Sequence, residues 1–171
     1  MVIADSTVLI SLAKVGCLRL LKERFSYVVI APTVLEEVVT GGIRKGATEV
    51  ARVQLAIREG WISIAEMSDR EAEIASTLVD VSGLDRGEAE SISIVQARRF
   101  KLIVDDREAR SIAASMQLEH AGTIGVLLEM HLGGHISDEE FEKYVVEVAK
   151  VLWVSPEVIA EVLRRAKRKN R

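Results

Sequence analysis

The sequence contains one cysteine, two prolines and few aromatic residues among its 171 residues. A single cysteine, Cys17, excludes a disulfide within the chain and favours a buried core thiol over a nucleophile. No stretch approaches the ~20 uninterrupted apolar residues of a membrane span. The first residues, MVIADSTVLI, lack a basic leader and a cleavage site. We therefore expect no signal peptide, no membrane segment and a cytoplasmic location.

Several widespread catalytic motifs are also missing. No GxxxxGK loop followed by Ser or Thr is present, and no GxGxxG follows the first apolar segment, so neither type of nucleotide-phosphate loop is predicted. Two glycines lie between His131 and His135 and disfavour a helical zinc pair. No serine or cysteine lies in a nucleophile elbow. We interpret Trp61 and Trp153 as packing residues.

The charge is unevenly distributed. A formal net charge of −3 predicts no overall attraction to nucleic acid. Six of the last eight residues are nevertheless Lys or Arg. Such a basic tail is suited to phosphate contacts, and it is equally well explained as the solubilising end of a frayed helix.

Short apolar runs alternate with helical patterns along the chain. Residues 2–4, 27–31, 61–65, 102–104 and 118–121 are predicted strands. Between them, helical periodicity predicts helices over residues 8–18, 32–39, 48–59, 69–79, 86–100, 107–116 and 123–132. This alternation predicts an α/β protein, a three-layer α/β/α sandwich around a parallel sheet of about four to five strands.

Helix signals continue to the end of the chain. Ser137 begins a capping-box pattern that opens a helix to about residue 151. Ser155 followed by Pro156 is typical of the start of a final helix. We expect residues 1–135 to form the main α/β domain, and residues 136–171 to form a helical extension with the basic tail, as part of the same unit.

Carboxylates directly follow two of the predicted strands. Asp5, with Ser6 behind it as an expected supporting residue, ends residues 2–4, and Asp105 and Asp106 end residues 102–104. In open α/β sheets, ligands bind at the edge where the strands end and the next helices begin. Any of these acids could also be a simple N-cap. The adjacent acids of the doublet repel each other, which Arg107 could compensate in part, together with Arg110.

Two further pairs of acids lie on helices that reach the same edge. Glu36 and Glu37 fall in the second turn of the helix from residue 32, and periodicity does not choose between them. Glu88 shares an apolar stripe that points inward, although it also completes a capping-box pattern that begins at Asp85. Glu90 is a competing candidate. Exposed or capping glutamates are the ordinary interpretation of each position.

Together, four separate segments bring carboxylates to one edge of one sheet. Like charges that converge in a cleft are costly without a counterion. Hard oxygen ligands favour Mg²⁺ or Mn²⁺. A carboxylate-held metal site is suited to phosphodiester hydrolysis, because the metal activates water and stabilises the attacking and leaving oxygens.

With these residues identified, the chain resembles the PIN-domain family, and within it a branch of prokaryotic members related to VapC toxins. The matching segments are VIADSTVLI, APTVLEEVV, GLDRGEAESI, LIVDDREAR and AGTIGVLL, in the family's order and within residues 1–130. The resemblance implies a ribonuclease that depends on Mg²⁺ or Mn²⁺. It assigns the metal-binding acids to Asp5, Glu37, Glu88 and Asp106, with Asp105 beside the last. Thr123 matches a Ser or Thr that often neighbours the metal.

The sequence departs from the family's pattern at two of these positions. The third acid is Glu88 where VapC toxins often have Asp, and Val104 stands where a Thr usually precedes the last acid. These departures motivate an alternative, a catalytically weak or inactive module for RNA binding or dimerisation. A metal-dependent DNA nuclease or phosphatase is a further alternative. The family also implies RNA as a partner, a possible antitoxin protein and a homodimer.

Overall fold

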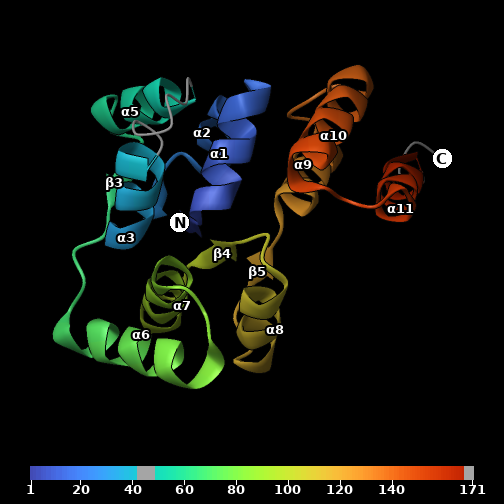
Figure 1. The fold of residues 1–171 in the computed structure, drawn as a ribbon. Helices are drawn as coiled ribbons and strands as arrows, with labels where there is room; N and C mark the ends of the chain where they lie inside the picture. Colours follow the sequence, from blue (N-terminus) through green and yellow to red (C-terminus); the bar gives the residue numbers. More distant parts are fainter. Residues whose placement is uncertain (42–48, 168–171) are drawn as a thin grey trace.

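Five short strands form the centre of the molecule (Figure 1). The computed structural model describes residues 1–41 and 49–167. Neighbouring strands are all parallel, in the order β3-β2-β1-β4-β5. The strands are β1 (Val2–Ala4), β2 (Val28–Ile30), β3 (Ile62–Ile64), β4 (Lys101–Ile103) and β5 (His120–Ala121). The predicted parallel sheet of an α/β protein is confirmed.

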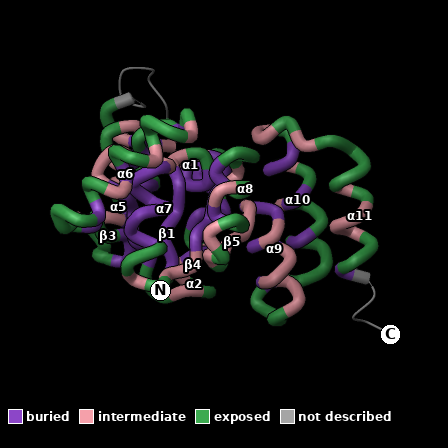
Figure 2. The backbone as a smooth tube through the Cα atoms, turned by 90° about the horizontal axis from the view of Figure 1, so that it is seen from below, coloured by how far each residue is buried: buried purple, intermediate pink, exposed green. Residues whose placement is uncertain are grey.

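The central strands are short but completely covered. Every residue of β1 and β2 is buried, as expected for parallel strands that have helices on both faces. Their sequences, VIA and VVI, are rich in the β-branched residues that pack well on a pleated surface. Figure 2 shows the buried residues concentrated around β1 and α7.

Helices lie on both faces of the sheet, as the three-layer prediction requires (Figure 1). On one face α2 contacts β2, and α1 packs against α5; on the other, α7 contacts β1 and β4 while α8 contacts β5. The helices are α1 (Ser6–Val15), α2 (Arg19–Phe25), α3 (Pro32–Leu35), α5 (Val50–Arg58), α6 (Asp69–Ser82), α7 (Arg86–Arg98) and α8 (Arg107–Ser115). Within residues 1–41 and 49–167, no helix is both long and apolar enough to cross a membrane.

The first predicted helix is in fact two. The prediction of one helix through residue 18 is wrong, because Gly16 adopts a left-handed conformation with φ of 81° and ends α1. The N–H of Cys17 then bonds to the carbonyl of Leu12 at 2.9 Å, and α2 begins two residues later. The periodic apolar positions continued across this break, so periodicity alone did not reveal it.

The helix that begins at Pro32 also differs from its prediction. After α3 the chain continues as a π-helix, η1 (Glu36–Gly41). A π-turn bonds each residue five positions along and is frequent at functional sites. The predicted glycine stop at 41–42 and the predicted helix start at 48 lie partly outside the described residues.

Three helices complete the chain beyond β5. They are α9 (Thr123–Leu132), α10 (Asp138–Leu152) and α11 (Pro156–Lys167). The Ser137 capping box is present, with the Ser137 hydroxyl accepting from the Glu140 N–H and the Glu140 carboxylate accepting from Ser137. Helix α10 packs against α1 and α9, and α11 packs against α9 and α10. The Lys and Arg residues at 168–171 lie outside the described residues.

The interpretation of Trp153 as a packing residue is wrong. Trp61 is buried, with 3% of its surface exposed, but Trp153 is 93% exposed. Trp153 ends α10 in a left-handed conformation, with φ of 54°. This conformation costs a residue with a side chain about 1–2 kcal/mol and usually selects glycine at such a position.

The single cysteine lies in the core, as interpreted from the sequence. Cys17 is 3% exposed, and burial raises the pKa of its thiol to about 12. A thiol with that pKa stays protonated near neutral pH, and the thiolate is the reactive form. Cys17 therefore contributes packing and not chemistry.

One ion pair joins α6 to α7, the helix that contacts β1 and β4. Glu71 of α6 is buried and accepts two hydrogen bonds from Arg98 of α7, at 2.7 and 2.9 Å. It also completes the capping box of Ser68 at the start of α6. Arg98 is the main reason that the pKa of Glu71 is lowered to about 2, so this carboxylate stays charged at neutral pH.

We predict that Glu71→Gln lowers the free energy of unfolding by about 1–3 kcal/mol, because Arg98 then loses its charged partner in a partly buried position. Denaturant unfolding followed by circular dichroism measures the change. The control is Glu73→Gln on the same helix, where the side chain is exposed. Equal stabilities for the two variants would contradict a role for the ion pair.

Candidate metal centre

The candidate site lies where the sheet reverses its winding. The chain passes from β1 outward to β2 and β3, then returns to place β4 on the other side of β1. Open α/β sheets bind ligands at the carboxyl ends of the strands beside this switch point. Asp5 follows β1 and the doublet Asp105–Asp106 follows β4, so all three acids lie at the switch point.

Asp5 is the most deeply buried acid of the site. It is 3% exposed, caps α1, and accepts a hydrogen bond from the N–H of Ser6 at 2.6 Å. Its own N–H donates to the carbonyl of Ile103, which fixes it against β4. Burial raises the pKa of Asp5 to about 6; the Ser6 N–H opposes this shift, and the carboxylates of Asp85 and Glu37 add to it.

The two acids after β4 have different environments. Asp105 accepts hydrogen bonds from the N–H and the hydroxyl of Thr123, at 2.8 and 2.6 Å. Thr123 is fully buried, so this pair ties the end of β4 to the start of α9. Asp106 is exposed and caps α8 by accepting from the N–H of Ala109. Asp105 is thus firmly held, while Asp106 lies beside Glu88 and raises its pKa.

Glu36 and Glu37 both lie in the π-helix η1, but their side chains have different environments. Glu36 is exposed, whereas Glu37 is half-buried and lies against α7, where a Cβ atom on Gly87 would be 3.0 Å from its Oε1. The pKa of Glu37 is raised by burial, against a hydrogen bond from the Ser6 side chain, with Asp85 and Glu90 adding to the rise. Glu37 therefore lies at the site, and Ser6 supports it.

Glu88 opens α7 at the same edge. It forms a capping box with Asp85, in which the Glu88 N–H donates to Asp85 at 2.8 Å and the Asp85 N–H donates to Glu88 at 3.2 Å. The pKa of Glu88 is raised to about 7, mainly by burial and also by the charges of Asp85, Asp106 and Asp5, while the Asp85 N–H lowers it. Glu88 therefore caps α7 and also belongs to a cluster of acids, which we call the acidic cluster and which consists of Asp5, Glu37, Asp85, Glu88 and Asp106.

Asp85 is a member of the cluster that sequence reasoning did not assign to the site. Its charge raises the pKa of Asp5, Glu37 and Glu88 alike, so it lies near all three. The capping-box pattern marked Asp85 as the start of a helix. That helix start lies at the same edge as the other acids, and this was the available signal.

Glu90, the competitor of Glu88, has a structural role. Its two carboxylate oxygens accept from the N–H and the hydroxyl of Thr33, both at 2.9 Å. Arg86 pairs with it at 3.0 Å. Glu90 is 5% exposed, and these bonds join α7 to α3 and so help to place Glu37 beside the cluster.

The cluster carries negative charge that no cation offsets among the residues described. In residues 1–41 and 49–167, no Lys, Arg or His forms an ion pair with Asp5, Glu37, Asp85, Glu88 or Asp106. Across the same residues, no three acidic, His or Cys side chains lie close enough together to hold a metal ion. The all-oxygen donor set and the uncompensated charge fit a hard divalent cation in chemistry. Binding would have to draw the side chains closer.

A groove of about 1000 Å³ begins at these acids and extends to the C-terminal helices. Glu88, Asp105 and Asp106 line one part of it, and Arg107 and Arg110 of α8 lie beside them. Trp153 and Val158 line the part formed by α10 and α11. The part of the acidic cluster formed by Glu88 and Asp106 is therefore open to a ligand larger than an ion.

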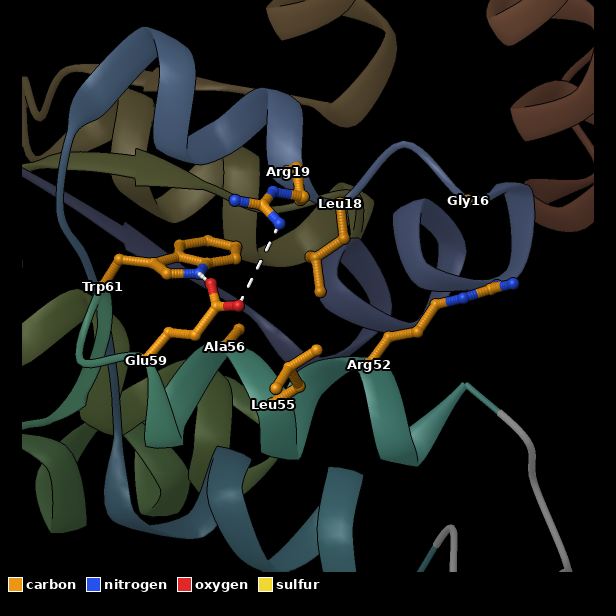
Figure 3. Close-up of a pocket in the computed structure, with 8 residues that line it drawn as sticks. All are labelled: Gly16, Leu18, Arg19, Arg52, Leu55, Ala56, Glu59 and Trp61. Carbon is orange, nitrogen blue, oxygen red and sulfur yellow. Dashed lines mark hydrogen bonds and ion pairs between the residues drawn. The ribbon is translucent and has the colours of Figure 1, made fainter.

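A second pocket, of about 200 Å³, lies at the opposite edge of the sheet (Figure 3). It is formed by the ends of α1 and α5 and by the residues just before β3. Glu59 accepts from the indole N–H of Trp61 at 3.1 Å and pairs with Arg19, and Arg52 donates to the carbonyl of Ala13. Its polar groups satisfy one another, so we assign it to packing.

Comparison with known proteins identifies the family. A family model described as a PIN domain matches residues 1–168. The chain belongs to the PIN-domain family, whose members are generally nucleases. No curated protein and no solved structure matches the chain. The family match extends through α10 and α11, beyond the residues on which the sequence resemblance rested.

The raised pKa values predict how the metal-free chain responds to pH. The folded pKa of Asp5 is about 6 against an ordinary 3.8, and that of Glu88 about 7 against 4.5. The folded chain therefore binds more protons than the unfolded chain between these values, and these groups make it more stable as pH falls from about 8 to about 5. In chelator, Asp5→Asn should flatten this dependence, as measured by denaturant unfolding.

The matched control is Glu36→Gln, which changes an exposed carboxyl on the neighbouring helix and should keep the wild-type pH dependence. The same slope in Asp5→Asn and wild type would show that burial of the Asp5 charge does not oppose folding.

Proposed function

We propose that the chain is a divalent-metal-dependent endoribonuclease that uses Mg²⁺ or Mn²⁺. The observation that carries this proposal is the acidic cluster at the switch point of the sheet, with Asp5 buried at its centre. Its carboxylates raise one another's pKa and have no cationic partner among the described residues. Membership of a family of nucleases supports the reaction class.

In this proposal Asp5, Glu37, Glu88 and Asp106 hold the metal, with Asp85 and Asp105 beside them. When bound, a divalent ion supplies the positive charge that activates water and stabilises the attacking and leaving oxygens of phosphodiester hydrolysis. The cluster lies at one end of the groove, so an RNA strand in the groove would reach it directly.

The remaining residues position these acids. The Ser6 N–H holds the Asp5 carboxylate, and the Ser6 hydroxyl bonds to Glu37. Thr123 fixes Asp105 through two hydrogen bonds. These hydrogen bonds hold Asp5, Glu37 and Asp105 at the edge of the sheet, and groups that are held before the reaction begins reorganise less during it.

A second candidate function is a PIN module that binds RNA or dimerises but has little or no activity. The observation that favours it is the spacing of the acids, of which no three within the described residues lie close enough to hold an ion. Under this alternative the chain binds Mn²⁺ weakly and no RNA is cleaved. A DNA nuclease or phosphatase is separated from both by comparing RNA, DNA and small phosphate esters as substrates.

Two further proposals about partners rest on the family resemblance. A toxin of this family pairs with an antitoxin whose peptide blocks the acidic groove, and members commonly form homodimers. A peptide of this kind would compete with RNA for the groove that begins at the acidic cluster.

We predict that Asp5→Asn lowers metal-dependent cleavage of single-stranded RNA at least about 100-fold, on the scale of losing a group that stabilises the transition state. Asn keeps the N-cap of α1, so circular dichroism should show an unchanged fold. The control is Glu36→Gln, which should cleave as wild type does. Full activity of purified Asp5→Asn would refute the assignment.

The neighbouring glutamates of η1 give a sharper test of metal binding. Glu37→Gln should weaken Mn²⁺ binding about 10-fold or more, because it removes a charged ligand, whereas Glu36→Gln should leave binding unchanged. Isothermal titration calorimetry measures both. Equal affinities for the two variants would remove Glu37 from the site, and no measurable Mn²⁺ binding by the wild type would favour the inactive module.

A further inference from the structure

The groove that starts at the acidic cluster has two walls of different chemistry. One wall is α8, which presents Arg107 and Arg110 three residues apart and thus on the same side of the helix. The other is the turn between α10 and α11, with Trp153, and the first turns of α11, with Val158. A single groove thus combines carboxylates, guanidinium groups and an aromatic ring.

The two arginines are available to a ligand. Both are exposed, and neither forms an ion pair with any residue in 1–41 or 49–167. The nearby Asp105 carboxylate is already bonded to Thr123. Planar guanidinium groups match the geometry of phosphate oxygens and are frequent phosphate ligands.

Trp153 is the most exposed large hydrophobic residue among those described, with 93% of its surface accessible. It occupies a left-handed helix end, where φ is 54° and glycine would be unstrained. Packing therefore does not explain a tryptophan here. Nucleobases stack on exposed aromatic rings of proteins that bind single-stranded nucleic acid, whatever the base.

We propose that this groove binds single-stranded RNA, with one base stacked on Trp153 and with Arg107 and Arg110 contacting phosphates between that base and the acidic cluster. The inference rests on the proposed function and extends it, because it names the path of the strand and a residue that favours unpaired over duplex RNA. A base within a duplex is already stacked and is not free to stack on Trp153.

A second copy of the chain could instead cover the exposed apolar residues of α10 and α11. The lining of the groove favours RNA, because a dimer contact centred on Trp153 would leave unpaired arginines and acids beside it. Figure 2 shows that α11 carries exposed and intermediate residues along most of its length. A dimer held together by Trp153 would overturn the proposal, and sedimentation would detect it.

The experiment measures binding of a labelled, short single-stranded oligouridylate to the full chain in chelator, where cleavage is absent. Trp153→Ala and Trp153→Gly should each raise Kd about 5- to 150-fold, the range for losing one stacked base. Trp153→Phe should fall between them and the wild type. Duplex RNA of the same length should bind more weakly than the single strand and should be insensitive to Trp153→Ala.

Trp153→Gly separates binding from folding. Glycine relieves the left-handed strain, so this variant should unfold at the same temperature as the wild type or higher, while its RNA affinity falls. Val146→Ala is the matched control, because Val146 is an exposed apolar residue of α10 that does not line the groove. It should bind RNA as the wild type does.

The arginines are tested through the salt dependence of binding. Replacing both with Gln should lower the slope of log K against log salt by about 0.7 for each phosphate that the protein no longer neutralises. An unchanged slope would contradict the proposed binding of phosphates by these arginines.

Three results would overturn the proposal. If Trp153→Ala and Trp153→Gly bind RNA as tightly as wild type while Asp5-dependent cleavage persists, the ribonuclease function stands and the stacking role fails. If sedimentation shows a wild-type dimer that Trp153→Ala converts to a monomer with unchanged RNA affinity, the ring belongs to a dimer contact. If the wild type neither binds nor cleaves RNA, the proposed function and the groove assignment fail together.

Discussion

The main physical constraint on this structure is the concentration of negative charge between β1 and β4. Six carboxylates, those of Asp5, Glu37, Asp85, Glu88, Asp105 and Asp106, lie at the carboxyl edge of the sheet near these two strands, and Asp5 is almost completely buried. Nearby helix N-termini offset part of this charge, since Asp5, Asp85 and Asp106 each cap a helix and the helix dipole favours anions at that end. Burial, together with the charge that is not offset, raises the pKa of Asp5, Glu37 and Glu88. Folding thus brings together charges that a bound cation would relieve.

The same residues therefore serve the fold and the candidate site. A residue that caps a helix at the edge of the sheet is also directed toward the switch point, because strand ends and helix starts meet there. Capping and metal binding are often treated as competing explanations for an acid after a strand. In this chain Asp5 caps α1 and also belongs to the proposed metal site, and only the surroundings of its carboxylate distinguish it from an ordinary cap such as Ser137.

Much of this arrangement could be predicted from the sequence. Each prediction that was wrong or missing has an identifiable physical reason. Strand-end acids predicted the places of Asp5, Asp105 and Asp106, because a parallel sheet brings such ends to one edge. Helical periodicity does not distinguish Glu37 from Glu36, because the segment is a π-helix and not an α-helix. Asp85 was overlooked because its capping role was a sufficient explanation. The exposure of Trp153 depends on how α10 ends, in a left-handed conformation, which helical periodicity does not predict.

Gly87 shows a consequence of this crowding for the stability of the chain. Its φ is not positive, so no turn requires glycine there, and alanine would favour the helix by up to about 1 kcal/mol, less in a first turn. A methyl group would, however, come within 3.0 Å of Glu37 and 3.3 Å of Val34. Helix propensity and room for a carboxylate thus make opposite demands on one residue. Gly87→Ala would therefore look like a stabilising substitution when heat-resistant variants are sought, but its methyl group would displace the Glu37 side chain.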